Sequence, residues 1–213
     1  RNVSRQQIKE YQFPYNKIGN LADLMQPVYD HRKDYFIGCD ISPCVFEMFW
    51  RLRGLENAMI DLLSDPELVN EVFDKSANFS IELASTVIHR FELDWLWTGD
   101  DAGAQEAMLM SPATWRKLVK PHLKRIVNFG KSNGLFVAFH SCGAIRPILA
   151  DLVEMGIDVI NPIQCNCPGM NPLELKQEFG KNVAFMGGVD TQHILPYGSV
   201  DDVRKATCEL IEG

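Results

Sequence analysis

Residues 135–143 read Leu-Phe-Val-Ala-Phe-His-Ser-Cys-Gly, an apolar run that ends abruptly in polar and thiol side chains. A continuous apolar run of this length is typical of a buried parallel strand, because helices cover both faces of a parallel sheet. Four further segments show the same pattern between turn-forming residues: 35–39, 94–98, 158–163 and 182–186. The sequence therefore predicts five strands, each followed by polar residues.

Helical patterns fill the gaps between these strands. Asp65 is a predicted N-cap followed by Pro66 at the first helical position, and Ser111 with Pro112 repeats this arrangement. The expected helices start at 66, run from 112 to about 133 with a kink at Pro121, cover 145–155 and 172–179, and begin again near 201. This alternation indicates an α/β fold with a parallel sheet, and the polar residues after the strands favour a barrel of the (β/α)8 TIM type.

The composition indicates an ordinary globular protein. Hydrophobic residues make up 46% and charged residues 23% of the 213, and the net charge is −7. The acidic balance argues against a nucleic-acid partner, which usually meets a basic face. No apolar run reaches the ~20 residues of a membrane helix, and no signal-peptide core opens the chain. Six cysteines are too few for a disulfide scaffold. We therefore expect a cytoplasmic enzyme.

His140 and Cys142 are the most informative pair. Residues two apart on a strand point the same way, so the imidazole and the thiol should project together from one strand end. Such a pair suits zinc, and a catalytic zinc site needs about three protein ligands with one open position. Cys165 or Cys167, after the next strand, is a candidate third ligand. The alternative is a hydrogen-bonded histidine beside a buried cysteine, with no metal.

Other polar residues follow the predicted strands. Asp100 and Asp101 are candidate acid/base or cation-binding groups, and their adjacency suggests that only one faces a pocket. Asp190, after a pair of glycines that includes Gly188, is a third candidate catalytic carboxylate; the alternative is a turn cap. Asn161 and Gln164 are neutral hydrogen-bonding groups at another strand end. We expect Asp100 or Asp101, Gln164 and Asp190 to line one cavity with His140 and Cys142.

Taken together, several motifs resemble the uroporphyrinogen decarboxylase superfamily. They are Leu52-Arg53-Gly54, residues 99–105, Ser111-Pro112, Trp115-Arg116, residues 139–143, Asn161-Pro162-Ile163-Gln164, residues 169–172 and residues 187–192. The resemblance begins at about Tyr35 and keeps the order and spacing of the motifs. It implies a single barrel domain over residues 1–213, with 1–34 as a polar, partly helical lead-in. Five strands are fewer than the eight of that barrel, so we expect an incomplete barrel or a fragment of a longer protein.

The resemblance implies two alternative activities. The His-x-Cys-Gly segment is similar to the methyltransferase branch, where this His and Cys bind zinc, a later cysteine completes the ligand set, and a corrinoid protein is the partner. Gln105, Asn161, Gln164 and Gly188 are then expected to bind a small-molecule substrate. The other branch decarboxylates uroporphyrinogen without a cofactor, and its arginine-rich N-terminal segment has no match here.

Under the decarboxylase alternative, Asp100 or Asp101 would stabilise charge on pyrrole nitrogens. Only Arg51, Arg53 and Arg146 lie near the predicted strand-end loops, which is few for a substrate with many carboxylates. A third hypothesis is a non-catalytic subunit on the same scaffold. Broad barrel surfaces also make a homodimer an expectation.

Overall fold

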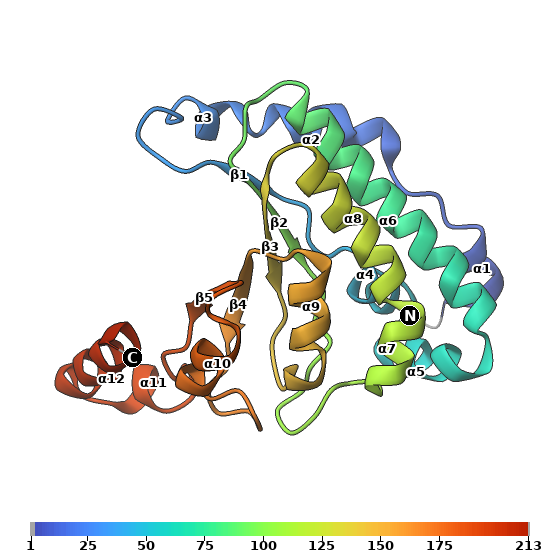
Figure 1. Cartoon of the computed structure of the whole chain (residues 1–213). Coiled ribbons are helices and arrows are strands. Elements are labelled where there is room, and N and C mark those ends of the chain that lie inside the picture. The colour runs from blue at the N-terminus through green and yellow to red at the C-terminus, as the bar shows by residue number, and fades with distance from the viewer. Residues whose placement is uncertain (1–2, 213) are drawn as a thin grey trace.

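The computed structural model describes residues 3–212 (Figure 1). The helices before and after the first strand are α1 (Arg5–Lys9), η1 (Tyr15–Lys17), α2 (Ile18–Asp23), α3 (Gln26–Tyr29), α4 (Phe46–Arg53), α5 (Leu55–Ser64) and α6 (Pro66–Ile88). The later helices are α7 (Pro112–Leu118), α8 (Lys120–Ser132), η2 (Arg146–Ile148), α9 (Leu149–Met155), α10 (Pro172–Phe179), α11 (Ile194–Tyr197) and α12 (Val200–Glu212). Within the described part of the chain, none of these helices has the length and apolarity needed to span a membrane.

Five strands form one sheet in sequence order. They are β1 (Gly38–Asp40), β2 (Trp95–Gly99), β3 (Phe136–His140), β4 (Val159–Ile163) and β5 (Ala184–Gly187). Each strand pairs in parallel with its sequence neighbour, which confirms the predicted topology. Sequential parallel strands with crossover helices are the repeating unit of a TIM barrel. The molecule is thus an α/β protein with a five-strand arc of the barrel.

The predicted boundaries need several corrections. β1 starts at Gly38 rather than at residue 35, because residues 29–35 continue as helix and turns. The helix that Asp65 caps is as predicted. The helix predicted from 112 is divided into α7 and α8 at Val119, just before Pro121. Residues 145–155 begin with a 3-10 turn, and α4 and α5 were not predicted.

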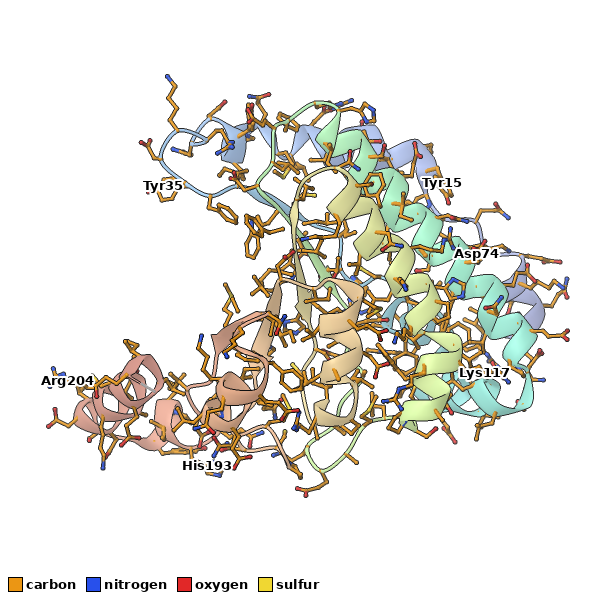
Figure 2. The ribbon with its side chains drawn as sticks, in the orientation of Figure 1. Tyr15, Tyr35, Asp74, Lys117, His193 and Arg204 are labelled. Carbon is orange, nitrogen blue, oxygen red and sulfur yellow. The ribbon has the colours of Figure 1, made fainter. Side chains whose placement is uncertain are left out.

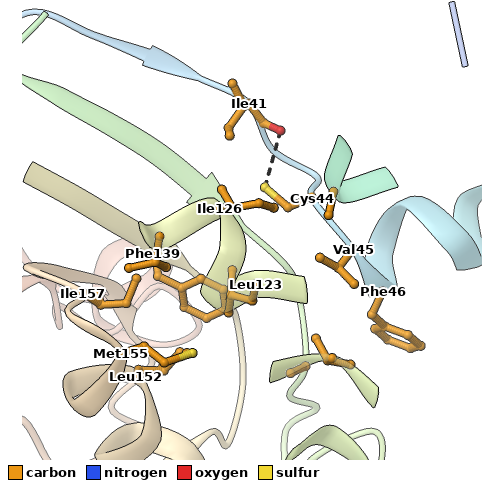
Figure 3. Close-up of a cluster of buried hydrophobic side chains, with 14 of the residues drawn as sticks. Ile41, Cys44, Val45, Phe46, Leu123, Ile126, Phe139, Leu152, Met155 and Ile157 are labelled. Carbon is orange, nitrogen blue, oxygen red and sulfur yellow. Dashed lines mark hydrogen bonds between the residues drawn. The ribbon is translucent and has the colours of Figure 1, made fainter. Parts of the chain in front are cut away.

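The two faces of the sheet have different environments. Val137 and Phe139 on β3 point toward the helices and are fully buried. Figure 3 shows Phe139 among side chains from α8, such as Leu123, and from α9 with its following turn. Phe136 points to the opposite face and is 53% exposed. His140 shares this second face with Phe136, because strand side chains alternate. The second face is therefore the barrel-interior side, and it carries the imidazole.

Ion pairs fasten the N-terminal segment to the outer helices. The buried carboxylate of Asp61 on α5 accepts hydrogen bonds from Arg5 at 2.8 Å and from Arg53 at 2.8 Å. Its side chain is 1% exposed, and both arginines neutralise it. A buried carboxylate with two guanidinium partners is stable only while both stay in place. This contact ties the lead-in to α5, while helices α1 and α2 pack against α6.

The two faces of β3 predict different costs of side-chain deletion. Phe139→Ala should lower the free energy of unfolding by about 3–5 kcal/mol, because it leaves a cavity between the sheet and α8. Phe136→Ala, on the same strand but half exposed, should cost less than about 1 kcal/mol. Urea denaturation followed by circular dichroism measures both. Equal losses in the two variants would mean that the helix-facing side is not the packed one.

Candidate functional site

Three ligand-type side chains meet at the carboxyl ends of β2 and β3. Asp101 follows β2, His140 ends β3, and Cys142 lies two residues further on. The Nε2 atom of His140 lies 3.6 Å from Oδ1 of Asp101 and 3.6 Å from Sγ of Cys142. One potential ligand atom from each residue lies within 4.8 Å of the other two. The predicted pair of His140 and Cys142 is thus brought together, with Asp101 as its third member.

Asn161 fixes the orientation of the imidazole. Its Oδ1 accepts a hydrogen bond from Nδ1 of His140 at 2.9 Å, which leaves Nε2 as the lone-pair nitrogen facing Asp101 and Cys142. The ring of Trp97, on the same face of β2, lies 6.2 Å from the imidazole between centroids. A partner on the second ring nitrogen is the usual way in which a protein orients a metal-binding histidine. Asn161, expected as a substrate-binding residue, instead contacts the imidazole.

Backbone contacts bring the two strand-end loops together. The N–H of Cys142 donates to Oδ1 of Asp101 at 2.8 Å, and the N–H of Ala144 donates to the carbonyl of Ala104 at 2.8 Å. A Cβ atom on Gly103 would lie 2.5 Å from the carbonyl oxygen of Cys142, and one on Gly143 would meet Gly103 at 2.5 Å. Only glycine allows so close an approach of two backbones. The two glycines therefore hold Asp101 near Cys142.

The surroundings of Cys142 disfavour the thiolate form of its side chain. Partial burial raises the pKa of the Cys142 thiol, and the neighbouring Asp101 carboxylate raises it further. A nearby positive charge would have the opposite effect, because it favours the thiolate.

Asp100 and Asp101 have different surroundings despite their adjacency. The Asp100 side chain is buried, and its two oxygens accept hydrogen bonds from the backbone N–H groups of Phe46 at 2.8 Å and Glu47 at 2.6 Å. Burial raises the pKa of Asp100 to about 7, against the lowering effect of the two N–H donors. Its carboxylate caps the first turn of α4, a structural contact rather than the catalytic one expected. The two carboxylates thus have different surroundings, and only Asp101 meets His140 and Cys142.

A cavity of about 390 Å³ lies beside Cys142. Its lining comes from the ends of β4 and β5 and the loops after them: Pro162, Ile163, Gln164, Cys165, Asn166, Gly187, Gly188, Val189, Thr191 and Leu195. Of the residues expected to share one cavity, Cys142 and Gln164 line it, and so does Gly188, which was expected to bind substrate. Asp101 and His140 lie at its Cys142 side without lining it. The expectation of one common cavity was therefore too inclusive.

Asp190 does not reach the His140 cluster. Its Oδ1 accepts hydrogen bonds from the backbone N–H groups of Gln192 at 2.7 Å and His193 at 2.9 Å, and from the amide of Asn166 at 2.7 Å. Desolvation raises the pKa of Asp190, but these donors outweigh it and bring the pKa to about 2. The carboxylate holds the turn after β5, as in the alternative stated for it.

Neither candidate third cysteine joins the cluster. Among residues 3–212, the only group of three close ligand atoms that contains His140 and Cys142 has Asp101 as its third member. The Cys165 thiol donates to Oδ1 of Asn166 at 3.6 Å, and Cys167 is 4% exposed. Cys165 does line the cavity beside Cys142. Where the sequence predicted Cys165 or Cys167 beside His140 and Cys142, the structure places Asp101.

Three residues near the site were not identified from the sequence. Glu47, on α4, accepts the N–H of Asp101 at 3.5 Å, and Asn166 and Gln192 link the loops around the cavity. Glu47 lies inside a helix that was not predicted. Asn166 lies between Cys165 and Cys167, and its carboxamide was the signal available in the sequence.

The fold and the cluster define a TIM-barrel-type protein with a histidine, a cysteine and a carboxylate at the carboxyl ends of its strands. Residues 37–213 match the family model described as uroporphyrinogen decarboxylase (URO-D), and the chain belongs to this family. A search of curated proteins gave no match.

A solved structure, a methyltransferase from Methanosarcina mazei, is similar in fold. The TM-score is 0.68 and the sequence identity 21%, over 93% of this chain and 54% of that one. At this identity the likeness concerns the fold alone. The present chain spans about half the length of the methyltransferase.

Removal of the two aspartate side chains should lower the free energy of unfolding by different amounts. Asp100→Ala should lower the free energy of unfolding by about 2–4 kcal/mol, because it leaves two buried N–H groups without an acceptor. Asp101→Ala removes a partly exposed carboxylate and should cost less than about 1 kcal/mol. Urea denaturation of both variants makes the comparison. A larger loss in Asp101→Ala than in Asp100→Ala would contradict the assignment of Asp100 as the structural member.

Proposed function

We propose that this protein is a zinc-dependent methyltransferase or demethylase that works with a corrinoid protein on a small methyl donor or thiol. The single observation that carries the proposal is the cluster of Asp101, His140 and Cys142. Membership of the uroporphyrinogen decarboxylase family and the fold of the Methanosarcina mazei methyltransferase support it.

The spacing of the cluster fits zinc. Tetrahedral bonds of about 2.0–2.3 Å place ligand atoms about 3.3–3.8 Å apart. The His140 Nε2 atom lies 3.6 Å from each of the other two ligand atoms, within this range. Imidazole, thiolate and carboxylate are all zinc ligands, and three protein ligands leave a fourth position for a substrate. The residues present therefore fit the ion.

The chain's own groups would prepare the site. Bound zinc would supply Lewis acidity and favour the thiolate form of a thiol substrate. Asn161 holds the His140 tautomer in which Nε2 is free, and Cys142 loses its thiol proton when it becomes a ligand. The side chains of Ile163 and Leu195 give the adjoining cavity an apolar wall. The corrinoid partner would dock over this end of the sheet, where the loops leave the cavity open.

The decarboxylase alternative is less well supported by the contacts. Its substrate carries many carboxylates and needs free cationic groups. Arg51 is paired with Glu47, Arg53 with Asp61 and Arg146 with Glu178. Asp100, one of the two carboxylates considered for pyrrole binding, is occupied by the backbone of α4. Among residues 3–212, no specific contact favours the non-catalytic alternative.

Zinc retention tests the proposal at its central residue. Cys142→Ser in the natural full-length protein should weaken zinc binding by at least about tenfold, because a hydroxyl is a poorer zinc ligand than a thiolate. Cys208→Ser is the matched control, since Cys208 is an exposed thiol on α12. Metal analysis after dialysis against a competing chelator measures the affinity. A Cys142→Ser protein that retains a full equivalent of zinc at wild-type affinity would contradict the assignment.

The activity is tested with zinc-loaded protein and methylcobalamin. Loss of the methylcobalamin absorbance in the presence of a panel of thiols is the expected result, and it should disappear in Cys142→Ser but not in Cys208→Ser. Incubation with uroporphyrinogen is the parallel arm. Formation of coproporphyrinogen without methyl transfer would overturn the proposal in favour of the decarboxylase.

A further inference from the structure

Carboxamide side chains link the loops around the cavity beside Cys142. Gln105 comes from the loop after β2, Gln164 and Asn166 from the loop after β4, and Gln192 from the loop after β5. Figure 2 shows Tyr35, before β1, toward the top of the view and His193, after β5, toward the bottom. The carboxamides thus lie at the end of the sheet that holds the candidate site.

Gln105 lies at the centre of these contacts. Its Oε1 accepts hydrogen bonds from Nε2 of Gln164 at 3.1 Å and from Nε2 of Gln192 at 2.8 Å. Its own Nε2 donates to the backbone carbonyl of Asn166 at 3.2 Å. One side chain therefore contacts both of the loops that form the two sides of the cavity. The side chains that it links carry no net charge, so these contacts do not depend on ionic strength as a surface ion pair would.

On one side, the contacts lead to the candidate metal ligands. The N–H of Gly143 donates to Oε1 of Gln164 at 2.8 Å, one residue after Cys142. On the other side, Gln192 belongs to the turn that Asp190 holds through backbone N–H groups. That turn, with Gly188, forms the opposite wall of the cavity. Hydrogen bonds that pass through Gln105 therefore help to fix the separation of the two walls, together with the direct hydrogen bond from Asn166 to Asp190.

We propose that Gln105 is a positioning residue that sets the width of the cavity beside Cys142 by holding the loop after β5 in place. The inference rests on the proposed function only in treating this cavity as the substrate cavity. As a positioning residue, Gln105 does not have to contact a substrate or a metal. The oxygen of its side chain is the essential atom, because it accepts both linking hydrogen bonds.

Two substitutions separate this role from simple loss of bulk. Gln105→Leu keeps the size but removes the acceptor, whereas Gln105→Glu keeps an acceptor oxygen for Gln164 and Gln192. Gln177→Leu is the control, since Gln177 is an exposed glutamine on α10, away from these loops. Hydrogen–deuterium exchange of residues 187–195 is the first measurement. The second is the rate at which Cys165, which lines the cavity, reacts with a bulky maleimide relative to iodoacetamide.

We expect Gln105→Leu to speed exchange in residues 187–195 by roughly 5- to 20-fold, because it removes all three hydrogen bonds of the side chain, including the one from Gln192 in that segment. The maleimide rate at Cys165 should rise more than the iodoacetamide rate. Gln105→Glu, which loses only the donor to the Asn166 carbonyl, should give a smaller increase than Gln105→Leu, and Gln177→Leu should stay within about twofold of the wild type for both measurements. Exchange in α6 should be unchanged in all three variants, because α6 lies far from these loops in the fold.

Wild-type exchange and alkylation in Gln105→Leu would overturn the proposal, as would equal effects of Gln105→Leu and Gln105→Glu. If Gln105→Leu does not fold, Gln192→Leu removes the hydrogen bond that joins Gln105 to the loop after β5 and should give an increase of similar size in the same segment; no increase would also overturn the proposal. Zinc affinity is measured in parallel and should not change in Gln105→Leu. A wild-type protein that binds no zinc would contradict the proposed function while leaving the exchange comparison valid.

Discussion

In the parallel pair of β2 and β3, Gly99 lies opposite His140, and the next residues of each strand leave the sheet side by side. A Cβ atom on Gly99 would lie 3.2 Å from Cβ of His140, so the glycine makes room for the imidazole in this register. A slip of one residue would turn His140 toward the helices, because strand side chains alternate between faces. The meeting of His140 with Asp101 and Cys142 therefore depends on this register, and the cavity wall at Cys142 depends on it in turn.

The neighbouring aspartates illustrate how one strand end serves both stability and chemistry. Asp100 points toward α4 and accepts hydrogen bonds from two backbone N–H groups in the first turn of that helix. N–H groups in a first turn have no carbonyl acceptor within their own helix. Asp101 points to the interior face, where it meets His140 and accepts the N–H of Cys142. Because the capping contact of Asp100 fixes the backbone at residues 100 and 101, it also holds the Asp101 side chain beside His140 and Cys142. Such a division of roles gives a rigid ligand set, which metal and transition-state binding both favour.

The sequence predicted the parallel sheet and the His140–Cys142 pair because both depend on local patterns: apolar runs, and a two-residue spacing on a strand. The third member was harder to predict. Cys165 and Cys167 are chemically better zinc ligands than a carboxylate, but the turn after β4 directs them away from His140, and no spacing rule reveals such a turn. Asp190 was similar in context to Asp101, since both follow strand ends. The difference lies in the backbone N–H groups of the turn that follows Asp190, which hold its carboxylate and are set by φ and ψ angles rather than by residue type.

Different parts of the fold hold the cluster of Asp101, His140 and Cys142 and the opposite wall of the cavity. His140 belongs to a strand, and its partners Asp101 and Cys142 lie within two residues of strand ends, in loops pressed together at Gly103 and Gly143. The opposite wall of the cavity lies in a loop after β5, and exposed carboxamides hold it. Exposed neutral hydrogen bonds are individually weak because water competes for them. Substitutions in that loop can therefore alter the shape of the cavity without moving His140, Cys142 or Asp101.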